Sequence, residues 1–230
     1  MISGGYEAPL QPVYYAAFQA MRALSGHEDP TKASTPFDLN RGGFVLAEGA
    51  ATLILESLEH AQERGARIYA EWKGAGTASD AYDMVAPPED GSGIRYAMEA
   101  ALRSGGLAPE DIDYINAHGT GTQINDRVET AAIRQVFGEQ ADELVVSSTK
   151  SMIGHMMGAA GAVEAAVAVL ACHHGAVPPT INYETPDPAC DLDYVPNEAR
   201  HVPVRHAMST SVGLGGHNSA VIFGAWGNGS

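Results

Sequence analysis

Two consecutive strand-to-helix units in residues 112–164 constrain the fold of this chain more than any other feature. Each unit opens with a short apolar run of the kind that is buried in a sheet. A polar residue follows each run, His118 in the first unit and Lys150 in the second, and His155 comes five residues after Lys150. Because ligands of open α/β sheets bind where strands end and helices begin, we expect these three side chains to share one site.

The segment after His118 predicts a sharp turn and then a helix. Glycines on both sides of Thr120 permit the turn. Asn125 or Asp126 offers an N-cap, and Glu129 three residues after Asp126 suggests a capping box in which Asp replaces the usual Ser or Thr. An apolar side then continues to a glycine that ends the helix, Gly138.

Length and charge limit the class of protein. A chain of 230 residues can form one core or two small ones. The net charge of −15, with only 13 basic residues spread thinly, argues against nucleic acid or an anionic membrane as a partner. Two cysteines, Cys172 and Cys190, indicate reduced thiols rather than a disulfide framework. The first ten residues lack the features of a secretory signal.

The rest of the chain alternates between strand and helix patterns and predicts an α/β protein. We expect strands near residues 1–5, 51–55 and 68–78, helices over 12–24 and 93–104, a helix closed by Gly65, and two strands joined by a glycine-rich turn over 206–226. That turn is no Rossmann phosphate loop, because no helix follows it.

Three segments have competing interpretations. The apolar stretch 156–172 could be a membrane span, but it is short and carries Glu164 near its middle, which favours a buried core helix. The pair His173-His174 resembles metal ligands, but adjacent histidines at a helix end more often cap its carbonyls, and zinc is not expected without further ligands. The acids in 187–193 predict a solvated loop.

Several motifs, in order along the chain, resemble one enzyme family. They are Asn116-Ala-His-Gly-Thr-Gly-Thr122, Asn125-Asp126 with Glu129, Ser148-Thr-Lys-Ser-Met-Ile-Gly-His155 and Gly213-Leu-Gly-Gly-His-Asn218, with Pro36-Phe-Asp38, Gly42-Gly-Phe44 and Glu48-Gly49 upstream. Together they are similar to the β-ketoacyl-acyl-carrier-protein synthases of the elongating, type II fatty-acid kind. The similarity runs from residue 2 to about residue 223.

The resemblance implies the thiolase-like fold, an α/β architecture layered αβαβα. It implies that residues 1–80 are the end of the N-terminal half and residues 81–230 the C-terminal half. The implied reaction is a decarboxylating Claisen condensation of malonyl-carrier-protein with an acyl thioester in fatty-acid synthesis. The implied partners are acyl carrier protein, bearing acyl and malonyl groups on phosphopantetheine, and a second copy or an N-terminal-half partner. We expect a cytoplasmic protein with no cofactor, no metal, no nucleic acid and no membrane.

By the same resemblance, His118 and His155 are the active-site histidines, and Lys150 fixes the polar network with Glu129 as the buried acid near it. Supporting residues are Asp126, Thr120 and Thr122, and the substrate gate is Gly213, Leu214 and Gly215. The condensation needs donors aimed at a developing enolate oxygen, and neutral imidazoles supply them. A helix N-terminus at His155 is expected to keep that ring neutral.

The chain departs from the family's pattern in ways that bear on activity. The family's nucleophilic cysteine lies upstream of the matched region, so we expect a fragment or one subunit of a split enzyme that is inactive alone. Leu214 replaces an aromatic residue, Val85 replaces a hydroxyl residue, and Gln123 replaces a proline. The alternatives are a non-catalytic partner like a chain-length factor, or half of a polyketide-type ketosynthase. A thiolase is disfavoured, because the glycine-rich turn lacks a second cysteine.

Overall fold

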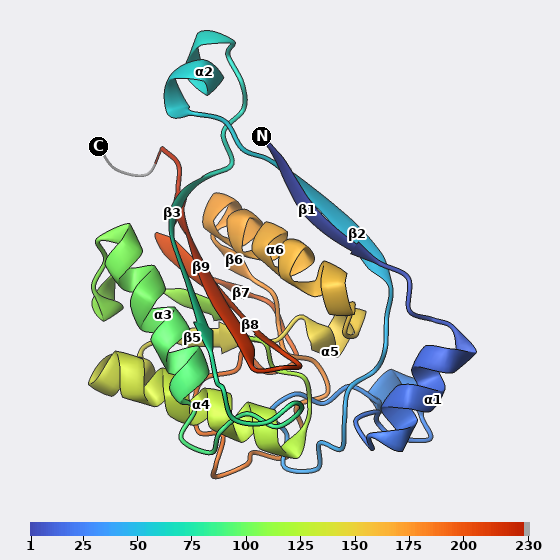
Figure 1. The fold of residues 1–230 in the computed structure, drawn as a ribbon. Coiled ribbons are helices and arrows are strands. Elements are labelled where there is room, and N and C mark those ends of the chain that lie inside the picture. Colours follow the sequence, from blue (N-terminus) through green and yellow to red (C-terminus); the bar gives the residue numbers. More distant parts are fainter. Residues whose placement is uncertain (228–230) are drawn as a thin grey trace.

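A five-stranded mixed sheet forms the centre of the computed structural model, which describes residues 1–227 (Figure 1). Its strands, in spatial order, are β3 (Ala70–Ser79), β9 (His217–Ala225), β8 (His206–Gly213), β4 (Tyr114–Asn116) and β5 (Val145–Ser147). β4 is parallel to β5 and β8, whereas β9 is antiparallel to β8 and β3. The two predicted units around β4 and β5 are therefore neighbours in the sheet.

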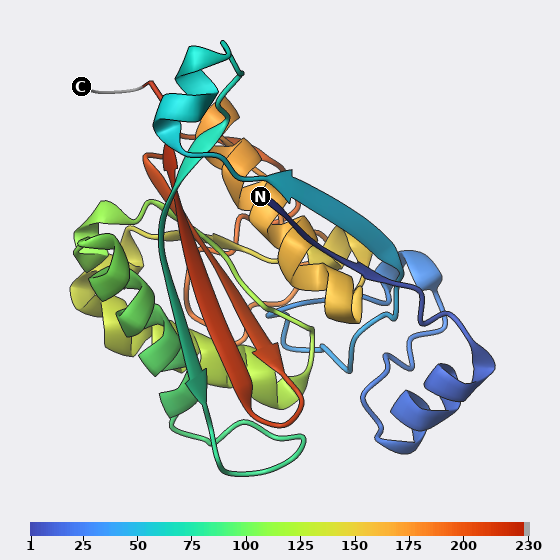
Figure 2. The ribbon, with the colours of Figure 1, turned by 45° about the horizontal axis from the view of Figure 1, so that its top comes forward.

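Helices cover both faces of this sheet. One face carries α3 (Ser92–Gly105) and α4 (Gln123–Phe137), and the other carries α6 (Ala160–His174). An antiparallel ribbon of β1 (Ile2–Glu7) and β2 (Gly49–Ile54) packs on the far side of α6, as Figures 1 and 2 show. The alternation of ribbon, helix, sheet and helices confirms the predicted layered α/β class.

The strand period divides the buried side chains between two cores. Tyr114 of β4 packs among residues on the α6 side, with Ala168 and Phe223, while its neighbour Ile115 packs with Met98 and Ile133 on the α3–α4 side. Successive strand side chains point to opposite faces, so both faces of this apolar strand are covered.

Smaller elements complete the fold. They are α1 (Pro12–Ala20), α2 (Leu58–Glu63), α5 (Lys150–Ile153), the pair β6 (Ala176–Val177) and β7 (Arg200–His201), and the 3-10 turns Pro30–Lys32, Pro109–Asp111, Gly138–Asp142 and Met157–Ala159. The predicted strands and helices are present with boundaries that differ by a few residues. Of the acids predicted to lie in a solvated loop, Asp191 is exposed, but Asp187 is buried and pairs with Arg41 at 2.5 Å.

The predicted core helix lies where the sequence suggested. Met157–His174 is the one helical segment among the described residues that is long and apolar enough to cross a membrane. In this fold α6 is held between the β1–β2 ribbon and the central sheet, with Glu164 and Cys172 among its buried residues. That placement is typical of a core helix.

Candidate active site

The parallel pairing of β4 and β5 brings the predicted site residues to one edge of the sheet. Asn116 is in register with Ser147, so the residues that follow the two strands leave the sheet side by side. The rings of His118 and His155 lie 5.3 Å apart between centroids, nearly perpendicular at 85°. Lys150 starts α5 directly after β5 and is almost fully buried. The structure therefore places the three side chains in one cluster.

Glu129 holds the backbone at His118 and does not form a capping box. The helix α4 begins at Gln123 with Thr122 as N-cap residue, so Glu129 lies inside the helix and is buried. Its two carboxylate oxygens accept hydrogen bonds from the backbone N–H groups of His118 and Gly119, each at 2.8 Å. The hydroxyl of Thr210 also donates to this carboxylate, at 2.7 Å. The predicted capping box is wrong, because the carboxylate serves the preceding turn.

Asp126 supports the same turn from the same helix. Its carboxylate accepts the backbone N–H of Phe37 at 2.8 Å and that of Gly121 at 3.1 Å. Burial raises the pKa of Asp126 to about 6, although the hydrogen bond from Phe37 and the charge of Arg41 act to lower it. Two buried acids, one turn apart on α4, thus fix the backbone from His118 to Gly121.

Gly119 explains how the chain leaves the strand so abruptly. Its φ of +35° lies in a region that disfavours side chains, and an added Cβ would lie 2.6 Å from the Cβ of Ser148 and 2.9 Å from the Phe37 ring. Only glycine fits between these two segments. The turn can therefore pass closely enough to bring His118 beside the residues that follow β5.

Both imidazoles are held neutral. Burial lowers the pKa of His118 well below its usual value, with the charges of Lys150 and His155 adding to the effect. Burial, and then the Lys150 ammonium, lower the pKa of His155 to about 3. The predicted neutrality of His155 is confirmed, but a helix N-terminus is not its main cause. Its Nδ1 accepts the backbone N–H of Met157 at 3.2 Å, which leaves the ring proton on Nε2.

Lys150 pairs with Glu164 of α6, whereas Glu129, the buried acid expected near Lys150, bonds to the backbone of His118 and Gly119. The Lys150 ammonium donates to the Glu164 carboxylate, and both side chains are 1% exposed. Burial raises the pKa of Glu164 to about 7, and the ammonium opposes that rise. A lone acid within the apolar stretch 156–172 was the available signal, because a buried carboxylate requires a partner.

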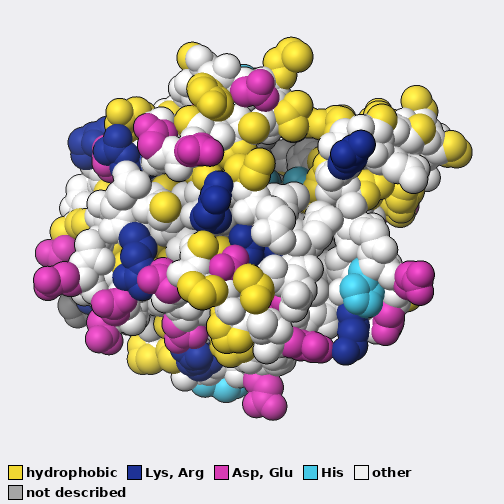
Figure 3. All heavy atoms as spheres, turned by 90° about the horizontal axis from the view of Figure 1, so that it is seen from below, with side chains coloured by type: hydrophobic (Ala, Val, Ile, Leu, Met, Phe, Trp, Pro, Cys, Tyr) yellow, Lys and Arg dark blue, Asp and Glu magenta, His cyan; other side chains and the backbone are white. Residues whose placement is uncertain are grey.

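The two histidines border a cavity of about 1130 Å³. Thr120 and Thr122 line it, and their hydroxyls are 3.0 Å apart. The ring of Phe44, the last residue of the Gly42-Gly-Phe44 motif, lies 5.2 Å from that of His155. Figure 3 shows the surface hollowed on the face seen from below, with apolar side chains gathered around the hollow. The arrangement suits a ligand with an apolar body and a polar reacting end.

The predicted gate lies on the wall of this cavity. Gly213 and Leu214 line it, and Leu214 is 52% exposed. The backbone N–H of Gly215 donates to the carbonyl of Met84 at 2.8 Å, which ties the β8–β9 turn to the loop after β3. Val85, in that loop, also lines the cavity.

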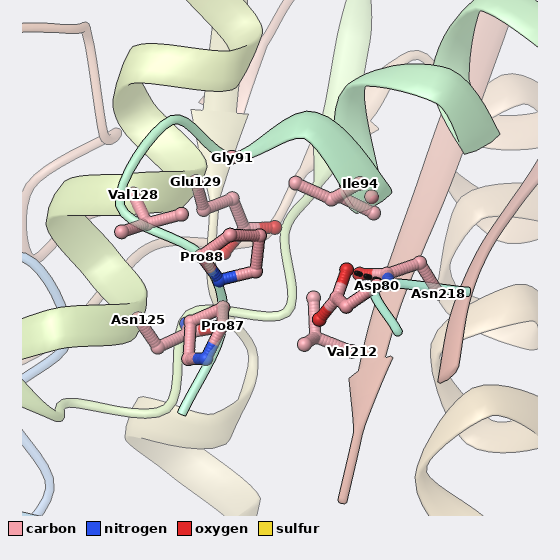
Figure 4. Close-up of a pocket in the computed structure, with 11 residues that line it drawn as sticks. Asp80, Pro87, Pro88, Gly91, Ile94, Asn125, Val128, Glu129, Val212 and Asn218 are labelled. Carbon is pink, nitrogen blue, oxygen red and sulfur yellow. Dashed lines mark hydrogen bonds between the residues drawn. The ribbon is translucent and has the colours of Figure 1, made fainter. Parts of the chain in front are cut away.

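A second, small cavity of about 10 Å³ lies behind this turn (Figure 4). Glu129 lines it from α4, and Asp80 and Asn218 line it from the opposite side. The Asn218 amide donates to the Asp80 carboxylate at 2.7 Å. Its volume suits about one water molecule, so the region behind Glu129 is closely packed.

Neither cysteine belongs to the site. Cys172 and Cys190 are 2% and 1% exposed, and burial raises their pKa values to about 12 and about 11. They are structural thiols, as the sequence suggested for Cys172. Within residues 1–227, no three His, Cys, Asp or Glu side chains form a group that could hold a metal ion.

Comparison with known proteins gives the family. Residues 69–184 match the family described as "Beta-ketoacyl synthase, C-terminal domain", and residues 1–61 match "Beta-ketoacyl synthase, N-terminal domain". The chain belongs to the β-ketoacyl synthase family. It is 51% identical over 223 residues to the 3-oxoacyl-[acyl-carrier-protein] synthase 2 of Staphylococcus aureus (strain COL), covering 97% of this chain and 54% of that protein. The synthase 2 of Coxiella burnetii (strain RSA 493) is 52% identical, with the same coverage.

Solved structures agree with this β-ketoacyl synthase assignment. The AntDE:AntF complex, a type II PKS acyl-carrier protein with its ketosynthase bound to the hexaketide, matches with a TM-score of 0.95 and 44% identity, over 98% of this chain and 56% of that one. A β-ketoacyl synthase from Burkholderia phymatum STM815 matches with a TM-score of 0.92 and 40% identity, over 98% and 54%. The chain spans about half the length of the relatives it matches.

Proposed function

We propose that this β-ketoacyl synthase chain forms the decarboxylation and enolate-binding part of a fatty-acid condensing site. The observation that carries the proposal is the pair of neutral imidazoles, His118 and His155, facing one cavity beside the buried Lys150–Glu164 pair. Neutral imidazoles donate a hydrogen bond without presenting a positive charge that would hold the substrate carboxylate too tightly. Relatives named 3-oxoacyl-[acyl-carrier-protein] synthase support the reaction class.

The reaction places charge where these donors lie. The bond between the malonyl carboxylate and its α-carbon breaks, carbon dioxide leaves, and the electron pair passes to the thioester oxygen as an enolate. The Nε2–H of His155, left free by the bond at Nδ1, donates to that oxygen, and His118 supplies the second donor. The carbanion carbon then attacks the acyl thioester carbonyl and expels its thiolate. Burial, and next the charge of Lys150, keeps both rings neutral.

The partners follow from the same chemistry. The cavity would receive acyl and malonyl groups on the phosphopantetheine of an acyl carrier protein, with Thr120 and Thr122 contacting the polar arm and Leu214 closing over the acyl chain. A relative of known structure is described as a ketosynthase in complex with such a carrier. We place the protein in the cytoplasm, as a homodimer or with an N-terminal-half partner. The division of the chain near residue 80 remains a prediction, and its last three residues lie outside the described part.

A chimera tests this function. Because the chain spans about half of its relatives, it would replace the matching region of the Staphylococcus aureus synthase. The chimera should release carbon dioxide from malonyl-acyl-carrier-protein and form the β-ketoacyl product with an acyl-carrier-protein primer. A well-folded chimera that does neither would refute the proposal.

A further inference from the structure

Arg41 is a buried cation that joins three segments of the chain, two of which line the cavity. Its side chain is 2% exposed, yet its guanidinium is well supplied with acceptors. Nη1 donates to Asp187 at 2.5 Å and to the carbonyl of Asp38 at 2.9 Å, while Nε and Nη2 donate to the carbonyls of Thr122 and Gln123, each at 3.0 Å. One side chain therefore links its own loop, the start of α4 and the loop at Asp187.

The Gln123 side chain in turn bonds to the backbone of Arg41. Its side-chain amide donates to the backbone carbonyl of Arg41 at 2.5 Å, while its own carbonyl accepts from the Arg41 guanidinium. The two residues thus form a reciprocal clamp between the loop before Phe44 and the first turn of α4. Proline, which the resemblance leads one to expect at position 123, has no side-chain donor for this bond.

The two segments joined by Arg41 and Gln123 lead to the two imidazoles. On one side, the chain leads from His118 to Gln123 and lines the cavity with Thr120 and Thr122. On the other, the segment after Arg41 pairs directly with the backbone of His155. The N–H of His155 donates to the carbonyl of Val45 at 2.7 Å, and the N–H of Ala47 donates to the carbonyl of His155 at 3.0 Å. The same segment bonds to the turn after His118, where the N–H of Gly43 donates to the carbonyl of Gly121 at 2.9 Å.

We infer that Arg41 and Gln123 are positioning residues that set the separation of the two histidines across the cavity. The loop they clamp is the only backbone that bonds both to the turn after His118 and to His155 within residues 1–227. A shift of this loop moves Phe44 and the His155 backbone relative to His118. The inference rests on the proposed function for its catalytic consequence, but its structural part can be measured without any activity.

Two substitutions of Gln123 remove the donor and leave the buried Arg41–Asp187 pair in place. Gln123→Met keeps the length of the side chain, and Gln123→Pro is compatible with the first position of a helix. The matched control is Gln135→Met on the same helix, where the side-chain amide donates to the Asp90 carbonyl at 3.4 Å on the exposed surface. Amide exchange at Gly43, Ala47 and His155, and decarboxylation of malonyl-acyl-carrier-protein, are measured in the chimera and compared with the parent.

Both Gln123 variants should exchange these three amides about three- to tenfold faster, the range for one lost hydrogen bond, while the control matches the parent. The kcat for decarboxylation should fall by a similar factor with KM unchanged, since donor placement rather than binding is altered. Unchanged exchange overturns the inference, as does a higher KM with unchanged kcat, which would make Gln123 a substrate contact. An inactive parent chimera refutes the proposed function, and the exchange rates then decide the positioning role alone.

Discussion

Two pairs of histidines in this protein have nearly the same local geometry and very different surroundings. The rings of His118 and His155 are 5.3 Å apart and 85° from parallel, and those of His173 and His174 are 4.8 Å apart and 77° from parallel. The first pair joins residues from two strand ends, 37 positions apart in sequence, whereas the second pair is adjacent at the end of α6. Ring geometry alone therefore does not distinguish a reaction site from a surface feature.

The two histidine pairs differ in burial and in the charged groups around them. His118 is 6% exposed, and its Nδ1 has no hydrogen-bond partner within residues 1–227. His174 is exposed, and the Nε2 of His173 contacts the Arg67 guanidinium at 2.8 Å. Only the first pair combines burial, a buried ammonium nearby and an open cavity. These features would let neutral imidazoles stabilise a developing negative charge.

The largest expected effect comes from removing the ammonium that sets the first pair apart. Lys150→Met leaves the Glu164 carboxylate buried without its cation, which should cost about 3–5 kcal/mol of unfolding free energy. Chemical denaturation of the chimera at neutral pH measures this loss. The control is Lys32→Met, which breaks an exposed, solvent-screened pair with Glu184 and should leave stability close to that of the parent. Equal losses in the two variants would show that the buried pair has no special role.

From the sequence, only those site residues that follow a predicted strand could be placed together. His118, Lys150 and His155 could be placed together because parallel strands deliver their following residues to one edge. The pairing of Lys150 with Glu164 does not follow from strand ends, since the apolar pattern of α6 indicates that this acid is buried but not which cation it meets. Asp126 and Glu129 were misread for a related reason. Local spacing favoured a helix cap, whereas in the fold both carboxylates accept hydrogen bonds from backbone N–H groups of preceding segments.

A second expected effect separates the chemistry of the cavity from its selectivity. Leu214 lies on the cavity wall and is 52% exposed, so Leu214→Phe should narrow the range of acyl primers by closing the pocket more tightly. Discrimination between primers should change by about 1–3 kcal/mol, while decarboxylation stays at the parent rate. The measurement is relative kcat/KM over a ladder of acyl-carrier-protein primers. An identical profile in parent and variant would remove Leu214 from the gate.

A smaller effect tests whether the fold keeps the His155 ring neutral. Folding lowers the pKa of His155 from 6.5 to about 3, so below pH 6.5 the unfolded chain binds a proton that the folded chain does not. The stability that this neutral ring contributes is present above pH 6.5 and is lost as the pH falls, by at most about 1.4 kcal/mol per pH unit. Glu164 and Asp126, whose raised pKa values act in the opposite direction, remain in parent and variant alike.

His155→Gln removes this titration. Between pH 6.5 and pH 5 the variant should therefore lose less stability than the parent, by up to about 1.4 kcal/mol per pH unit. The same substitution at the surface, His174→Gln, serves as the control. Denaturation midpoints at three pH values give the comparison. If His155→Gln and the parent lost stability in parallel, His155 would not be held neutral by the fold.

The most direct test of the account compares the two histidine pairs in one assay. Alanine replaces His118, His155, His173 or His174 singly in the chimera, and release of carbon dioxide from malonyl-acyl-carrier-protein is followed. Loss of His118 or His155 should raise the decarboxylation barrier by about 2–4 kcal/mol, with acyl transfer less affected, and loss of His173 or His174 should leave the rate at that of the parent. Parent rates in both His118→Ala and His155→Ala would contradict the assignment of the site.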